Sequence, residues 1–159
     1  MSLDTPSFQQ IDGSSFRFAI AAACYNEALV NALVREAGAT LAAAGAPAPL
    51  VERVPGSAEL PFAASVLAES GEFDAIIVIG MVIAGDTNHH NVIGDSTAIT
   101  LQQLAVQAGL PIINGIIVVD TQQQAEARAG SAINRGKEFA ETALAMAAYT
   151  RKWKNKNNP

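Results

Sequence analysis

Long apolar stretches alternate with stretches of helical periodicity along this chain. The apolar stretches show little alternation of apolar and polar residues, which is typical of strands covered on both faces of a sheet. The stretches between them are rich in alanine and carry larger apolar residues three or four positions apart, as amphipathic helices do. The pattern predicts strands over residues 16–25, 46–54, 73–83 and 110–119, and helices over residues 26–45, 54–71, 91–109, 120–130 and 134–153.

Residues that begin or end helices lie where this pattern changes. Asn26 follows the first predicted strand and is expected to be the N-cap of the first helix. The segment 54–71 opens with a turn, and Pro61 falls in the first helical turn, where its missing N–H has no helical partner to lose. Gly109 is expected to end the third helix. The last predicted helix is expected to pack one face, which carries Phe139, Leu144 and Met146.

Strands and helices in alternation predict an α/β fold. Four or five such units with strands that lack polar alternation favour an open, mostly parallel sheet with helices on both faces, which makes three α/β/α layers. Ligands of such sheets bind past the carboxyl ends of the strands. The unusual polar residues of this chain gather in the segments expected there, which are residues 24–28, 55–60, 80–90 and 114–120.

Composition narrows the class of protein. The 159 residues suffice for one domain with a proper core. Half of the residues are apolar and 16% are charged, whereas about a quarter is usual. We expect part of the surface to be covered by self-association, because no apolar run is long enough to span a membrane. The net charge of −5 argues against a nucleic-acid partner, which would require a basic face.

The two ends and the single cysteine bear on domain bounds and compartment. We expect one domain over residues 16–153, after a flexible lead-in over residues 1–15 that orders only against a partner surface, if at all. Residues 154–159 are expected to fray, as chain ends do; the alternative is that the basic tail meets an anionic partner. Cys24 is the only cysteine, so no internal disulfide can form, and the N-terminus lacks a signal-peptide core. A cytoplasmic location is expected.

The segment GDTNHH at residues 85–90 carries the most distinctive chemistry. Gly85 allows a close approach of the backbone to a ligand, Thr87 offers a hydroxyl, and the following helix presents free N–H groups. Together they would bind an anion such as phosphate, provided that the carboxylate of Asp86 points away. The alternative is an ordinary strand-to-helix turn with Asp86 or Thr87 as the N-cap.

The two histidines of the chain, His89 and His90, follow this turn. Adjacent helical residues point in different directions, so the two side chains are not expected to serve one site. No second cluster of Cys or His completes a metal site, and we expect no metal. A histidine in a loop that faces a ligand suits proton transfer near neutral pH. At least one of the two is expected to be an ordinary surface residue.

Other polar residues at the strand ends allow two interpretations each. Arg128 could clamp a phosphate, or it could be a solvated cation at a helix end. Glu59 could accept hydrogen bonds from a hydroxylated ligand, or it could stabilise the first turn of its helix. Tyr25 ends the first strand, where its ring could stack on a planar ligand.

Taken together, these segments resemble the lumazine synthase family over roughly residues 16–150. The resemblance is carried by motifs in the right order, and any one of them alone would be weak. They are YNEALV, VPGSAELP, SGEFDAIIVIGMVIAGDTNHHNVI, GLPIINGIIVVDTQQQAEARAG and NRGKEFAETALAMA.

The resemblance implies a reaction, a fold and an assembly. The family condenses 5-amino-6-(D-ribitylamino)uracil with 3,4-dihydroxy-2-butanone 4-phosphate to 6,7-dimethyl-8-ribityllumazine, a step of riboflavin biosynthesis that releases phosphate and water. It uses no cofactor and no metal. Its subunit is flavodoxin-like, and its subunits form homopentamers, some packed further into shells, with each active site between neighbours.

The resemblance also implies residues that bind the pyrimidine and its ribityl chain. Tyr25 matches the aromatic position that stacks on the pyrimidine, where the family usually has Phe or Trp. Val82 and Ile83 would line the pyrimidine pocket. Ser57 and Glu59 match the turn that binds the ribityl chain. The adjoining residues Asn26 and Ala58 are included among the substrate-binding residues.

The resemblance implies that residues after the third strand and residues of a neighbouring subunit bind the phosphate and transfer protons. Gly85, Asp86 and Thr87 match the phosphate loop, and His89 matches the proton-transfer histidine. Arg128 of the neighbouring subunit matches the phosphate arginine. The position of Arg135, which contacts the uracil across the interface, and that of Asn114 complete the implied site.

This chain departs from the family pattern at several positions. Ala84 replaces a usual arginine, and Asn114 replaces an aromatic residue, which removes one apolar wall of the neighbour's pocket. The loop between Arg128 and Asn134 is one residue shorter than usual, which bears on shell formation. Two alternatives therefore stay open: a non-catalytic paralogue that binds a flavin or pyrimidine, and a mainly structural assembly protein.

Overall fold

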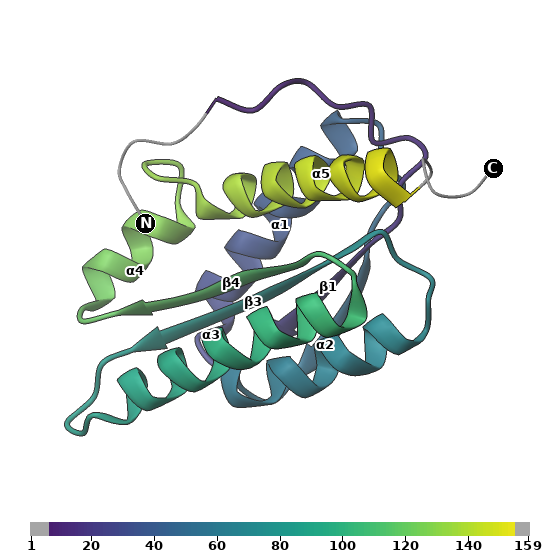
Figure 1. Ribbon diagram of the computed structural model, residues 1–159. Helices are drawn as coiled ribbons and strands as arrows, with labels where there is room; N and C mark the ends of the chain where they lie inside the picture. The colour runs from purple at the N-terminus through teal and green to yellow at the C-terminus, as the bar shows by residue number, and fades with distance from the viewer. Residues whose placement is uncertain (1–6, 155–159) are drawn as a thin grey trace.

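The computed structural model describes residues 7–154, in which strands and helices alternate (Figure 1). The strands in this range are β1 (Phe18–Ala23), β2 (Leu50–Val54), β3 (Ala75–Ile83) and β4 (Ile112–Val119). The helices are α1 (Glu27–Ala43), α2 (Leu60–Glu69), α3 (His89–Ala108), α4 (Gln122–Ala129) and α5 (Arg135–Lys154), and the short 3-10 helix η1 (Ser57–Glu59) precedes α2. Every predicted strand and helix is confirmed, with ends shifted by a few residues.

The strands form one parallel four-stranded sheet in the order β2-β1-β3-β4. The chain passes from β1 to β2 on one side and then continues with β3 on the other side of β1, so the order reverses between β1 and β3. This is the flavodoxin-like order, and ligands of such sheets bind at the reversal, past the carboxyl ends of the strands. The predicted three-layer α/β/α fold is confirmed.

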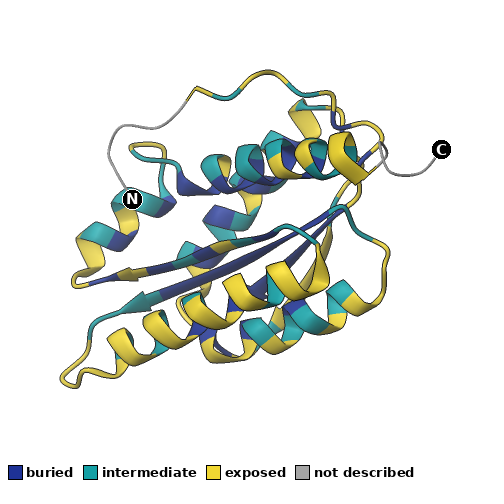
Figure 2. Ribbon diagram, viewed as in Figure 1, coloured by how far each residue is buried: buried dark blue, intermediate teal, exposed yellow. Residues whose placement is uncertain are grey.

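The two faces of the sheet hold separate apolar cores. Alternate residues of a strand point to opposite faces, so Phe18 and Ile20 of β1 pack under α1, α4 and α5, whereas Ala19 and Ala21 pack under α2 and α3. We refer to these as the α1–α4–α5 face and the α2–α3 face. Figure 2 shows the central strands β1 and β3 between them as buried along most of their length.

Three details of the predicted elements differ in the structure. Helix α3 begins at His89, two residues before the expected start at Asn91. The expected burial on both faces is wrong for the two edge strands, because burial along β4 alternates and β2 is exposed along most of its length. On α5, Phe139 and Leu144 are buried as predicted, but Met146 is 39% exposed, so its place on the packed face was wrong.

The segment before β1 packs against the last helix and the end of α1. The backbone N–H of Gly13 donates to the carbonyl of Ala44, and Arg151 donates to the hydroxyl and carbonyl of Ser15. Of the predicted lead-in and tail, residues 1–6 and 155–159 lie outside the described residues. Within residues 7–154, no helix has the length and apolarity needed to cross a membrane.

Candidate active site

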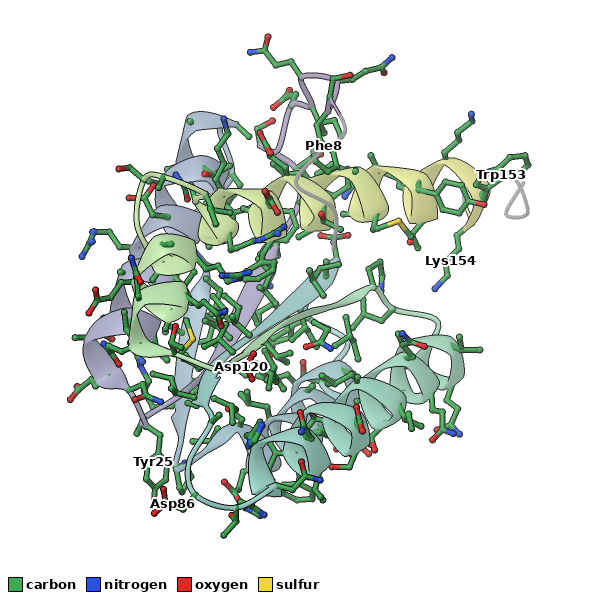
Figure 3. All side chains as sticks on the ribbon, turned by 90° about the vertical axis from the view of Figure 1, so that its left-hand side faces the viewer. Phe8, Tyr25, Asp86, Asp120, Trp153 and Lys154 are labelled. Atoms are coloured by element: carbon green, nitrogen blue, oxygen red, sulfur yellow. The ribbon has the colours of Figure 1, made fainter. Side chains whose placement is uncertain are left out.

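A pocket of about 440 Å³ lies at the carboxyl ends of β1 and β3, where the strand order reverses. Figure 3 looks onto this end of the molecule and shows Tyr25 and Asp86 there, far from Trp153 and Lys154 at the end of α5. The pocket is lined by the β1–α1 turn, the turn before α2, the end of β3 and the first turn of α3. Its lining residues are Tyr25, Asn26, Gly56, Ser57, Ala58, Glu59, Met81, Val82, Ile83, His89 and Ile93.

Tyr25 forms one wall of this pocket and presents its ring to solvent. The side chain is 72% exposed, so a planar ligand could stack on it. The ring lies close to Gly56, where an added Cβ would sit 3.3 Å from Tyr25 Cδ2 and 3.1 Å from Glu59 Oε2. Gly56 therefore leaves room for an aromatic ring and a carboxylate to approach the same turn.

Ser57 is buried against β3. An added Cβ at Gly80 would overlap the Ser57 hydroxyl, so the turn approaches the strand this closely only because residue 80 has no side chain. This packing places Ser57, Ala58 and Glu59 at the pocket, as the sequence predicted for a turn at the head of α2.

Val82 and Ile83 form the wall at the end of β3. They pair with Val118 and Val119 of β4, so one edge of this segment is held by the sheet. Asn26 reaches its other side, and its Nδ2 donates to the carbonyl oxygen of Met81 over 2.8 Å. Asn26 occupies the N-cap position of α1, but its side chain makes no capping hydrogen bond, because its amide is bonded to β3 instead. Asn26 is thus confirmed as the N-cap, without a side-chain capping bond.

His89 is the first residue of α3 and lies in the pocket. Gly85, Asp86 and Thr87 form the exposed loop that joins β3 to this helix, beside the pocket rather than in its lining. The N-cap of α3 is Asn88, and it makes no side-chain capping bond. The alternative with Asp86 or Thr87 as the N-cap is therefore wrong, and no N-cap side chain covers the N–H groups of the first turn.

His90, unlike His89, does not line the pocket. Its Nδ1 lies 3.1 Å from the carbonyl oxygen of Thr87, within its own loop, and it is absent from the pocket lining. The structure thus separates the two histidines, as expected for adjacent helical residues.

Besides the loop residues Gly85, Asp86 and Thr87, three further predicted residues are absent from the lining of this pocket in the single chain. Asn114 is in the middle of β4, where its Oδ1 accepts from the N–H of Ile116. Arg128 is on α4, on the face of the sheet opposite α3, and its guanidinium donates to the carbonyl of Gln124 over 3.0 Å. Arg135 begins α5 with its side chain 7% exposed and paired with Glu138.

The pocket also contains residues that the sequence did not single out. Gly56 and Met81 lie beside predicted residues, and their role depends on packing that only the fold reveals. Ile93 is four residues after His89, so helical spacing alone could have placed it on the same side of α3. Among residues 7–154, no three His, Cys, Asp or Glu side chains gather in a way that could hold a metal ion.

Comparison with known proteins connects this chain to an enzyme family. A sequence model of the 6,7-dimethyl-8-ribityllumazine synthase family matches residues 15–151. A protein of that name from Gloeobacter violaceus is 40% identical over 147 residues, which cover 89% of this chain and 82% of the relative. One from Xanthomonas euvesicatoria is 41% identical over 133 residues, covering 82% and 86%. One from Methylobacterium radiotolerans is 40% identical over 136 residues, covering 85% and 82%.

Proposed function

Because the chain belongs to the 6,7-dimethyl-8-ribityllumazine synthase family, we propose that it condenses 5-amino-6-(D-ribitylamino)uracil with 3,4-dihydroxy-2-butanone 4-phosphate. The products are 6,7-dimethyl-8-ribityllumazine, phosphate and water. The observation that supports this most is a single pocket in which an exposed aromatic ring, a carboxylate and an imidazole meet, contributed by Tyr25, Glu59 and His89.

The pyrimidine and its ribityl chain suit the two halves of this pocket. The Tyr25 ring offers a stacking surface for the flat pyrimidine, and Val82 and Ile83 add an apolar wall to the same pocket. The hydroxyl of Ser57 and the carboxylate of Glu59 are suited to the hydroxyl groups of the ribityl chain. Both come from one turn, so a linear polyol could run along it.

The phosphate of the second substrate suits the loop before α3. The N-terminus of a 20-residue helix carries a partial positive charge, and the N-cap side chain does not cover its first N–H groups. Gly85 and Thr87 precede this terminus in an exposed loop. Phosphate bound there would bring the substrate's leaving group close to His89.

His89 is proposed to move protons during the condensation. Imine formation, loss of phosphate and ring closure each transfer protons, and an imidazole can serve as acid and as base near neutral pH. Most of the rate enhancement is expected from holding the two substrates together in the correct orientation. A guanidinium near the phosphate would stabilise the charge that develops as phosphate leaves.

That guanidinium is proposed to be Arg128 of a neighbouring chain, because α4 lies on the other face of the sheet from α3. Asn114 is proposed to face the neighbour's pocket from the exposed edge strand β4. Arg135 would reach a neighbour's uracil only if its pair with Glu138 separates, since its side chain is 7% exposed.

Self-association, proposed as a homopentamer, is supported by the surface of the α2–α3 face. Val92, Ile99 and Val106 lie seven residues apart on α3, and all three are more than half exposed. Apolar residues at this spacing form a seam that packs against another helix. Phe62 on α2 is also exposed, by 76%. An apolar surface of this kind is typical of a protein interface.

The cytoplasmic location stays a prediction.

The activity is tested directly by mixing the purified protein with both substrates and following the absorbance and fluorescence of the lumazine. We expect product to form well above the spontaneous rate, and phosphate to appear in equal amount. Formation no faster than in the absence of protein would contradict the proposed function. Tight binding of riboflavin without turnover would instead favour a flavin-binding paralogue.

A further inference from the structure

Asn26 has an unusual backbone conformation at the edge of the pocket. Its φ of 54° and ψ of 45° lie in the left-handed region, which asparagine and glycine tolerate better than other residues. Asn134 is the only other non-glycine residue with positive φ among those described. At Asn26 this conformation turns the chain from β1 into α1 and directs the side-chain amide at β3.

The amide of Asn26 replaces a missing strand neighbour. The ladder between β1 and β3 ends at the pair Ala22–Ile79, whereas the ladder between β3 and β4 continues to Ile83–Val119. Met81 lies two residues beyond the end of the first ladder and is 1% exposed. The hydrogen bond from Asn26 Nδ2 therefore satisfies a buried carbonyl that β1 no longer reaches.

This bond joins the two walls between which a flat ligand would lie. Tyr25 precedes Asn26 directly, and Val82 follows Met81 directly, so the bond between Asn26 and Met81 links the stacking ring to the apolar wall. We propose that Asn26 is a positioning residue, which sets the distance between these walls through the Met81 carbonyl. The inference rests on the proposed function for the identity of the ligand, but the tether itself can be tested without it.

Two substitutions separate the side chain of Asn26 from its backbone conformation. Glycine and aspartate both tolerate the left-handed conformation, and neither has the side-chain N–H that donates to Met81 in the parent. We expect KM for the ribitylaminouracil to rise about threefold to tenfold in Asn26→Gly, as for one lost neutral hydrogen bond. The rise should be larger in Asn26→Asp, whose carboxylate would face the Met81 carbonyl. KM for the phosphate substrate and kcat should change by less than about twofold.

Hydrogen–deuterium exchange of residues 81–84 provides the measurement that does not depend on activity. Both variants should exchange these amides faster than the parent. Asn134→Gly is the matched control, because it removes the other left-handed asparagine, whose amide donates to Glu36; it should leave exchange at residues 81–84 unchanged.

The outcomes distinguish this inference from the proposed function. If Asn26→Gly matches the parent in KM and in exchange, only the backbone conformation matters and the inference is overturned. If KM values for both substrates and kcat change alike, Asn26 has a general structural role and the inference is likewise overturned. If the parent has no synthase activity, the proposed function fails, and the exchange rates alone decide whether Asn26 tethers β3.

Discussion

Helices α3 and α5 are both 20 residues long and lie on opposite faces of one sheet, yet they are buried to very different extents (Figure 2). Within α3 only Thr97 and Leu101 are buried. Seven residues of α5 are buried, including Phe139 and Leu144. Helix α5 is thus packed more deeply against its face of the sheet than α3 is. Large apolar side chains are exposed on both sides: Phe62, Val66, Val92, Ile99 and Val106 on α2 and α3, and Met146, Tyr149 and Trp153 on α5.

The two faces of the sheet thus differ in what they contribute: one supplies most of the core, and the other borders the pocket. The α1–α4–α5 face supplies most of the core of the single chain. The α2–α3 face borders the pocket through η1 and the first turn of α3. If the proposed assembly forms, the face that becomes covered is one that borders the pocket. The predictions below test each side of this comparison.

The largest effect is expected from a charge on the exposed seam of α3. In Ile99→Asp, an unpaired carboxylate would enter the proposed interface, which should weaken each contact by roughly 3–5 kcal/mol. The assembly should dissociate to single chains in analytical ultracentrifugation, and activity should fall with it. Ala39→Asp on the exposed side of α1 is the control and should assemble as the parent does. An Ile99→Asp protein that keeps the parental size would contradict the role of this seam.

A core deletion on the α1–α4–α5 face should destabilise the single chain. Phe139 is 4% exposed, and its ring packs against Gly115 of β4, where an added Cβ would lie 3.0 Å from the ring. Phe139→Ala should lower the free energy of unfolding by about 3–5 kcal/mol. The measurement is urea denaturation of proteins that also carry Ile99→Asp, because single chains exclude any contribution from assembly. Val106→Ala on α3 should change this free energy by less than about 0.5 kcal/mol with the same Ile99→Asp substitution present. Equal losses at the two sites would remove the contrast between the faces.

Removal of the pocket imidazole should slow the chemistry. His89→Ala should lower kcat about tenfold to a hundredfold, at the low end of general acid–base effects. His90→Ala is the matched control and should have a smaller effect, because His90 Nδ1 faces the carbonyl of Thr87 instead of the pocket. If the two variants lose activity equally, His89 has no special part in proton transfer.

The smallest effect is expected from the arginine on the opposite face. Arg128→Ala should raise KM for the phosphate substrate about tenfold, as for a lost charge-assisted hydrogen bond. If Arg128 acts in a neighbour's pocket, reassembly of equal amounts of Arg128→Ala and His89→Ala chains should restore about a quarter of the sites in a closed ring. Activity of the mixture no greater than the mean of the two separate proteins would place both residues in one chain's site.

Much of the fold and part of the site were predictable from the sequence, because the signals are local. Apolar runs and helical periodicity depend on neighbouring residues, so the strands and helices were predicted with small errors at their ends. Parallel strands bring their carboxyl ends to one edge, and this placed Tyr25, Ser57, Glu59 and His89 together in one pocket. The place of Ile93 in the pocket could also have been predicted, because it lies four residues after His89 on the same helix.

The remaining features depend on the tertiary structure. Asn26 and Met81 are 55 positions apart, and they meet only because β1 ends before β3 does. Ser57 fits against β3 because Gly80 faces it. Strand order and register follow from the packing of the whole core, so no local pattern contains them. Local patterns in the sequence therefore fix which elements form and which loops border the pocket, whereas tertiary packing fixes which side chains meet in it.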